Sequence, residues 1–292
     1  MNRETLFLNA TQSTGNLPTS VSTNSPTNSP ASSLKNIDKN TVKNEIDNVA
    51  SHTPTNLRTI NTFMKRKTHM GKKAQIGLSD AYQSYFAQKN LDAILAMDIE
   101  GIDNLRALFN NPKQPLTLEI GFGMGTSLVE MAKADPKRNF VGIEVHEAGL
   151  GNCAFLAGEQ GLTNLQLISG DALALMKQLP KNHIDTVQLY FPDPWQKKRH
   201  YKRRFVNTGR MAVVAQVLTD GGIFHAATDW EHYAFWMLEV LDGLAEFNNV
   251  AGKGAFLPRP NFRPLTKFEQ RGINEGRVIY DLMYKKLAKK TG

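Results

Sequence analysis

The strongest constraint on the fold is a regular alternation of short apolar runs and longer amphipathic stretches beyond residue 115. The runs have strand length and are nearly continuously apolar, which is typical of parallel strands covered on both faces. Strands are predicted at residues 116–122, 139–145, 165–170, 184–191 and 221–228, and a last one at 277–287. Helical patterns lie between them at 126–134, 147–161, 172–179 and 207–218. This alternation predicts a doubly wound α/β sheet with right-handed crossovers.

The N-terminal part of the chain has a different composition. Residues 1–56 are rich in Ser, Thr, Asn and Pro, and Phe7 is their one aromatic residue. Such a segment buries too little apolar surface to offset its chain entropy, so we expect a disordered tail. Residues 57–115 are expected to hold a basic arm, densest over 58–73, and a helix over about 79–97, followed by a folded domain at 116–292. The arm is compatible with a solvated lead-in or with a nucleic-acid contact.

Charge and cysteine content narrow the class of protein. The chain carries 35 Lys and Arg against 27 Asp and Glu, a net charge of +8, which favours polyanionic partners. No apolar run approaches the roughly 20 residues that span a bilayer. A single cysteine, Cys153, excludes an internal disulfide and a multi-cysteine metal site, and no His/Cys cluster calls for a metal. We therefore expect a cytosolic protein without an obligatory protein partner, most simply a monomer.

A glycine-rich turn, "EIGFGMGTS", joins the first predicted strand to the first predicted helix and contains Gly121, Gly123 and Gly125. Glycines allow positive φ angles and a close approach of the backbone to a ligand. The dinucleotide fingerprint would need its third glycine at position 126, where the chain has Thr126, so a pyrophosphate cofactor is disfavoured. Glu119 would repel phosphates but suits a ligand with a cationic or amino end.

Three carboxylates follow successive predicted strands: Glu119, Glu144 and Asp171. Glu144 is placed to accept hydrogen bonds from both ribose hydroxyls, as in sites for NAD or for S-adenosylmethionine. Asp171 is compatible with accepting from an adenine amino group or with a simple helix N-cap. Open α/β sheets bind ligands at the carboxyl ends of their strands, so the three together favour S-adenosylmethionine.

The stretch "FPDPW" places Asp193 after the fourth predicted strand, over the same edge. Its two prolines restrict the backbone and predict a stiff platform that aims the carboxylate at the pocket. Trp195 is compatible with stacking on a base or with simple packing. A run of cations follows, at Lys197, Lys198, Arg199, Lys202, Arg203 and Arg204. Because this run adjoins the pocket and the arm adds a second basic segment, it predicts contacts with nucleic-acid phosphates.

Five motifs resemble those of the bacterial tRNA (guanine-N7)-methyltransferase family: "EIGFGMG", "GIEVH", "FPDPW" with its basic run, "TDW" and "TKFEQRG". They occur in order across about residues 58–287. The resemblance implies a class I methyltransferase fold with a seven-stranded, mostly parallel, Rossmann-like sheet. It also implies S-adenosyl-L-methionine as methyl donor and N7 of the variable-loop guanine of tRNA, guanine 46, as acceptor.

The same resemblance assigns roles to residues. It implies cofactor contacts at Glu119, Glu144, Asp171 and Asp193, beside the turn glycines Gly121, Gly123 and Gly125, with Asp193 also the catalytic residue. Substrate contacts are expected at Lys197, Asp229, Thr266, Lys267, Phe268 and Glu269. The remaining cations of the run, Lys198, Arg199, Lys202, Arg203 and Arg204, are expected to contact tRNA phosphates.

Guanine N7 carries a free lone pair, so the expected reaction needs alignment rather than deprotonation. Asp193 is expected to stabilise the positive charge that develops on the ring or to orient the base. Asp229 or Glu269 is expected to accept from guanine N1–H and the N2 amino group, although Asp229 also fits a helix N-cap and Glu269 a surface ion pair. His225 is expected to pack near the fifth strand and His146 to line the pocket rim. The alternatives are a small-molecule methyl or aminopropyl transferase, and a non-catalytic RNA-binding protein on the same fold.

Overall fold

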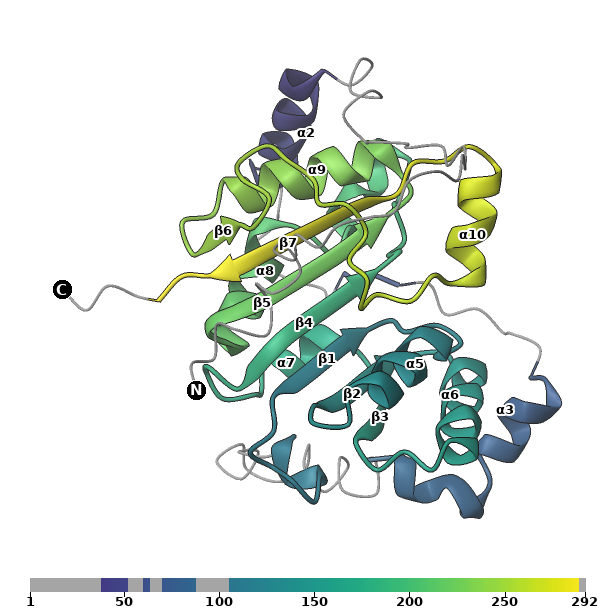
Figure 1. The fold of residues 1–292 in the computed structure, drawn as a ribbon. Coiled ribbons are helices and arrows are strands. Elements are labelled where there is room, and N and C mark those ends of the chain that lie inside the picture. Colours follow the sequence, from purple (N-terminus) through teal and green to yellow (C-terminus); the bar gives the residue numbers. More distant parts are fainter. Residues whose placement is uncertain (1–37, 52–59, 64–69, 88–104, 289–292) are drawn as a thin grey trace, which may run out of the picture.

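The computed structural model describes residues 38–51, 60–63, 70–87 and 105–288 (Figure 1). Seven strands form one sheet in the order β3-β2-β1-β4-β5-β7-β6. Their bounds are β1 Leu116–Ile120, β2 Asn139–Glu144, β3 Leu165–Ser169, β4 Ile184–Tyr190, β5 Leu218–Thr228, β6 Phe247–Asn249 and β7 Tyr280–Lys286. The first five are parallel, whereas β7 runs antiparallel to both β5 and β6. The predicted doubly wound, mostly parallel, seven-stranded sheet is confirmed.

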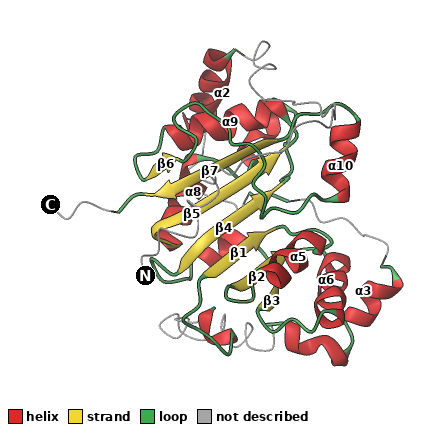
Figure 2. Cartoon of the chain, viewed as in Figure 1, coloured by secondary structure: helices red, strands yellow, loops and turns green. Residues whose placement is uncertain are grey.

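Helices cover both faces of this sheet. Figure 2 shows α5 (Thr126–Ala134) and α6 (Glu147–Glu159) in front of it, and α7 (Ala172–Met176) and α8 (Thr208–Val217) behind. Two separate buried apolar clusters match these layers, one containing residues of α5 and α6 and the other residues of α7, α8 and α9 (Glu231–Asp242). All residues of β1 and β2 are buried, which explains their continuous apolar pattern.

Two expectations about the N-terminal part are wrong. A 3₁₀ helix, η2 (Asp80–Tyr85), replaces the start of the helix expected at 79–97, and residues 88–97 lie outside the described residues. Phe86 then forms a parallel bridge with Leu167 of β3 and packs against the second apolar cluster. Pairing with the sheet edge has overridden local helical pattern there.

The predicted disorder of residues 1–56 is also wrong for part of that range. Residues 39–51 form helix α2 (Lys39–Ser51), which packs against α9. Val42 is 1% exposed, and Ile46 and Val49 pack partly buried against the main core. Average composition hid this one apolar stripe at spacings of four and three residues. Residues 1–37 and 52–56 lie outside the described residues.

Two further helices are α3 (Lys72–Gly77), which packs against α6, and α10 (Lys267–Asn274). Figure 1 shows α10 beyond the carboxyl ends of β4 and β5. The remaining 3₁₀ helices are η4 (Arg106–Leu108) and η5 (Lys198–Arg203). Within the described ranges, no helix is both long and apolar enough to cross a membrane.

Candidate functional site

The carboxyl ends of β1 to β4 open into one pocket. Its walls include Gly121, Glu144, Asp171 and Asp193, each from the end of a different strand. The structure therefore brings together four residues that the sequence placed at a cofactor site, at the edge where open α/β sheets bind ligands. His146 also lines this pocket, as predicted.

The turn between β1 and α5 depends on its glycines. Gly121, Gly123 and Gly125 have φ angles of 68°, 58° and 76°, all in the left-handed region that side chains disfavour. At Gly125 a Cβ atom would also lie 2.4 Å from the side chain of Cys153. The turn thus brings bare backbone to the pocket wall.

Glu144 is fixed at the end of β2 by backbone donors. Its Oε2 accepts from the amide of Gly123 at 2.9 Å, and its Oε1 accepts from the amides of Val145 at 2.7 Å and His146 at 3.1 Å. A carboxylate has about four acceptor positions, so capacity remains for a ligand hydroxyl. Glu144 is therefore preorganised as an acceptor in the pocket wall.

Glu119 lies buried in β1 and is 3% exposed. Its Oε2 has no hydrogen-bond partner among the described residues, and neither has Oε1 of Gln188, its register partner in β4. Burial, reinforced by the charge of Glu144, raises the pKa of Glu119 to about 8. Two buried acceptors without donors fit a cationic group such as the ammonium of an amino-acid moiety, and they fit a phosphate poorly.

Asp171 is both the N-cap of α7 and part of the pocket. Its Oδ1 accepts from the amide of Leu173 at 2.8 Å, so the simple capping role is confirmed. An additional contact with an adenine amino group stays a prediction.

The loop after β4 has an unusual backbone conformation. Phe191 and Trp195 have φ angles of 49° and 45°, and positive φ in bulky residues is strained. Between them Asp193 is exposed and lines the pocket. Trp195 is 8% exposed, and its Nε1 donates to the carbonyl of Thr62 at 3.1 Å. Of the two alternatives for Trp195, the structure shows packing, whereas Asp193 is presented as expected.

An N-terminal segment forms part of the pocket wall, which sequence reasoning missed. We call residues 60–63 the strap. Each of its four carbonyls accepts from a side chain of the region 195–210: Ile60 from Arg210 at 3.4 Å, Asn61 and Phe63 from Arg203 at 3.1 and 3.2 Å, and Thr62 from Trp195. Thr62 and Phe63 line the pocket. The beginning of the predicted basic arm is thus docked beside the cofactor edge.

The cationic run divides into residues with different surroundings. Lys197, Lys198, Arg199 and Lys202 are exposed, which suits phosphate contacts. Lys198 also pairs with Glu45 of α2 at 2.9 Å, with its side chain 78% exposed. Arg203 is half-buried, and its guanidinium lies 3.8 Å from the ring centre of Trp195 while it holds the strap.

The expectation that Arg204 contacts phosphates is wrong. It is 0% exposed and packs 3.7 Å from the ring centre of Tyr201. Its Nε donates to the carbonyl of Pro194 at 2.9 Å, and its Nη2 is hydrogen-bonded to Nδ1 of His232 at 3.2 Å. Burial lowers the pKa of Arg204. Arg204 therefore supports the loop from inside, because aromatic residues of α9 and η5 enclose it.

Four predicted substrate contacts lie at the start of α10. Thr266 is its N-cap and accepts from the amide of Glu269 at 3.1 Å. Lys267 and Phe268 are exposed, and the ring of Phe268 lies edge to face with Phe191 at 5.3 Å. Phe191 is part of the pocket wall, so α10 begins at the pocket mouth.

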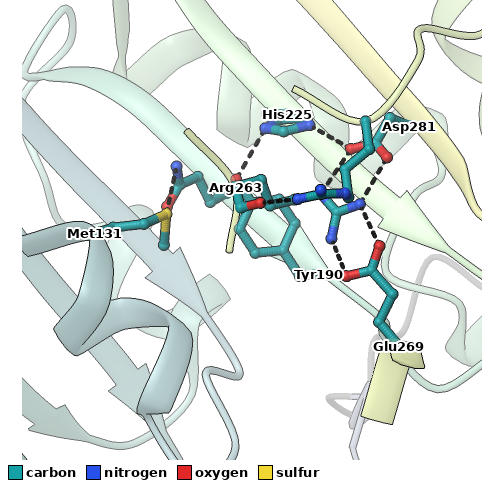
Figure 3. Close-up of polar contacts among 8 residues, drawn as sticks. Met131, Tyr190, His225, Arg263, Glu269 and Asp281 are labelled. Carbon is teal, nitrogen blue, oxygen red and sulfur yellow. Dashed lines mark hydrogen bonds and ion pairs between the residues drawn. The ribbon is translucent and has the colours of Figure 1, made fainter. Parts of the chain in front are cut away.

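Glu269 contradicts the expectation of a surface ion pair. It is 1% exposed, and its two carboxylate oxygens accept from Arg263 at 2.7 and 2.8 Å. With its side chain 0% exposed, it is not a surface charge, and a contact with the base stays a prediction. Figure 3 shows Arg263 between Glu269 and Asp281, whose carboxylate accepts two further bonds from the same guanidinium at 2.8 and 2.9 Å. No sequence motif had drawn attention to Arg263 or Asp281.

His225 extends this buried group into the sheet. Its Nε2 is hydrogen-bonded to Asp281 at 2.9 Å and its Nδ1 to the hydroxyl of Tyr190 at 2.8 Å. Burial lowers the pKa of His225, although the carboxylate opposes this effect. Burial alone would raise the pKa of Asp281, but bonds from His225 and Arg263 hold it below its usual value. The prediction that His225 packs within the fifth strand is confirmed.

Asp229 follows β5 and accepts from Arg277 through Oδ2. The N-cap of α9 is Trp230, so the capping alternative for Asp229 is wrong. Asp229 is outside the pocket wall described above, and a role in reading the base stays a prediction.

Comparison with known proteins places the chain among methyltransferases. Residues 113–282 match the family model described as "Putative methyltransferase". A "tRNA (guanine-N(7)-)-methyltransferase" of Acinetobacter baylyi is 52% identical over 79% of this chain and 89% of its own length. The protein of the same name from Vibrio cholerae is 43% identical over 80% of this chain and 94% of its own length. A solved 16S rRNA methyltransferase aligns with 66% of this chain and 95% of its own, at 14% identity and a TM-score of 0.45.

Proposed function

This chain belongs to the tRNA (guanine-N7)-methyltransferase family, and from that membership we propose that it methylates N7 of guanine 46 in the variable loop of tRNA. The methyl donor in this proposal is S-adenosyl-L-methionine. The observation that carries it is the meeting of Glu144, Asp171 and Asp193 in one pocket, beside exposed cations. Acidic groups around a donor pocket and a basic surface next to it are what a nucleic-acid methyltransferase requires.

In this proposal three polar parts of the donor have a partner in or beside the pocket. Glu144 would accept from a ribose hydroxyl, Asp171 from the adenine amino group, and Glu119 from the ammonium of the methionine part. The glycine turn of residues 121–125 would let the backbone approach closely. When bound, the donor supplies a methyl group on a sulfonium, which leaves with neither electron of the bond to sulfur.

In this proposal the chain's own residues align the guanine with the methyl group and stabilise the charge that develops on the guanine ring. Guanine N7 attacks with its own lone pair, so no side chain has to remove a proton. Asp193 stands exposed at the pocket, on a backbone stiffened by two prolines, where its carboxylate would stabilise the positive charge that the ring gains. Orienting the guanine is the other role that this position allows.

The tRNA would be held by the exposed cations Lys197, Lys198, Arg199 and Lys202. Phe268 and Lys267 would meet the target nucleotide at the pocket mouth, and Asp229 is the remaining candidate for the guanine edge. A cytoplasmic location follows from this substrate, and a monomer is the expected state.

Transfer of labelled methyl from S-adenosylmethionine to tRNA that lacks 7-methylguanosine tests the proposal. We expect label in 7-methylguanosine from the variable loop after nuclease digestion, and loss of it in Asp193→Ala. Label in a small acceptor without RNA would favour a small-molecule transferase. Tight tRNA binding without any transfer, in a protein that binds the cofactor, would favour a non-catalytic RNA-binding protein.

A further inference from the structure

Arg263 is the centre of a buried group of three charged side chains. It is 1% exposed and lies between Glu269 and Asp281, which are 1% and 0% exposed. Four charge-assisted hydrogen bonds of 2.7 to 2.9 Å join the guanidinium to these two carboxylates. Removing one partner from such a group leaves an uncompensated buried charge, so the three side chains act as a unit.

This unit connects two segments that are distant in sequence and meet at the pocket. One is the first turn of α10, to which Glu269 belongs. The other is the end of β4, since the guanidinium carbon of Arg263 lies 5.7 Å from the ring centres of both Tyr190 and Phe191. Phe191 lines the pocket two residues before Asp193 and contacts Phe268 of α10. Figure 3 shows Arg263 between Tyr190 and Glu269.

The cap of α10 supports this reading. In a capping box, an N-cap threonine accepts from the amide of the third helical residue, and the glutamate at that residue returns to the amide of the cap. Here Thr266 makes the first of these bonds, but both oxygens of Glu269 accept from Arg263. The side chain of Glu269 therefore links the start of α10 to a buried arginine instead of to the helix's own first amide.

Resting on the proposed function, we propose that Arg263 is a positioning residue that holds the first turn of α10 at the pocket mouth, and that Glu269 acts through Arg263 and makes no contact with guanine. In this arrangement Lys267 and Phe268 meet the target nucleotide because the helix start is fixed. A lysine cannot replace Arg263, because a single ammonium lacks the fork that pairs with two carboxylates at once.

The test uses Arg263→Lys, Glu269→Gln and the double variant, with single-turnover and steady-state methylation of two synthetic tRNAs. One carries guanosine at position 46 and the other inosine, which lacks the N2 amino group. The matched control is Arg106→Lys. Arg106 pairs with Asp185 at 2.6 Å and donates to the carbonyl of His183, at the opposite end of the strands.

We expect each single variant to lower kcat/KM about tenfold or more, the equivalent of one lost charge-assisted hydrogen bond. The loss should fall on kcat, because the exposed cations that grip the tRNA are untouched, and affinity for S-adenosylhomocysteine should stay within about twofold. The double variant should be no worse than the poorer single variant, and Glu269→Gln should lose the same factor on both tRNAs. Arg106→Lys should lower thermal stability but leave kcat within about twofold of wild type.

Three results would overturn the inference. A Glu269→Gln defect that disappears on the inosine tRNA would make Glu269 a direct reader of guanine. Additive losses in the double variant would show that Glu269 and Arg263 act independently. An Arg106→Lys defect in kcat as large as that of Arg263→Lys would show that the Arg263→Lys defect reflects a general loss of stability. Failure of the wild-type protein to form 7-methylguanosine would instead remove the proposed function, and with it this inference.

Discussion

The raised pKa of Glu119 makes cofactor binding depend on pH in a calculable way. In the free protein the carboxyl group has a pKa of about 8, against an ordinary value of 4.5, because it is buried beside Glu144. The proposed ammonium partner binds the ionised form, so the group must lose a proton when the cofactor binds below pH 8. Rising pH therefore tightens binding until Glu119 is ionised in the free protein.

The magnitude follows from the fraction of protein that carries the proton. The apparent Kd should scale with 1 + 10^(8 − pH), so binding tightens about ninefold from pH 6 to 7 and about fiftyfold from pH 6 to 8. At pH 7 about 0.9 proton should be released for each cofactor bound. Titration calorimetry with S-adenosylhomocysteine, in buffers of different ionisation enthalpy, measures both quantities.

Two controls isolate the carboxyl group. Glu119→Gln should bind more weakly at pH 8 but lose the pH dependence and the proton release. 5′-Methylthioadenosine lacks the amino-acid part of the cofactor and with it the ammonium group, so its affinity for the wild-type protein should not strengthen with rising pH. The same pH profile in wild type and Glu119→Gln, or binding without proton release at pH 7, would refute the pairing of Glu119 with the ammonium group.

Three other perturbations have clear expected outcomes. Charge reversal of Lys198, Arg199 and Lys202 together should weaken tRNA binding. It should also reduce, by about three, the steepness with which the logarithm of the association constant falls with the logarithm of the salt concentration. An unchanged slope would show that these residues do not contact tRNA phosphates. Gly125→Ala should abolish cofactor binding in calorimetry, because residue 125 has a positive φ and its new Cβ atom would collide with Cys153. The control is Gly161→Ala, since Gly161 also has a positive φ but has open space around it. This control variant should bind the cofactor normally. Val42→Ala should lower the free energy of unfolding by about 1–2 kcal/mol in urea, since this side chain is buried in the main core and α2 packs on α9. An unchanged midpoint would show that α2 is not docked.

Sequence reasoning succeeded where a local pattern determines the structure. The helix at 126–134 was predicted with its observed bounds, because the glycine turn starts it and the apolar positions are periodic. Strand β6 was missed, since three residues carry no period of their own. Helix α2 was missed because composition was averaged over 56 residues, and the helix expected at 79–97 was wrong at Phe86 because pairing with β3 decides that segment. Only the last of these differences is a tertiary effect, whereas the apolar stripe of α2 was present in the sequence and β6 is too short to show a period.

Prediction from the sequence is less complete at the site than in the fold. Residues of the same type have different roles there, because their surroundings differ. Arg199 and Arg204 belong to one cationic run, yet Arg199 is exposed and Arg204 is enclosed by aromatic rings. The carboxylates differ likewise. Glu119 has an oxygen without any donor, so it is ready for a cationic ligand, whereas both oxygens of Glu269 are occupied by Arg263. A motif identifies which carboxylates matter, but the fold decides whether a carboxylate lies at the pocket wall, as Glu144 does, or is buried against an arginine, as Glu269 is.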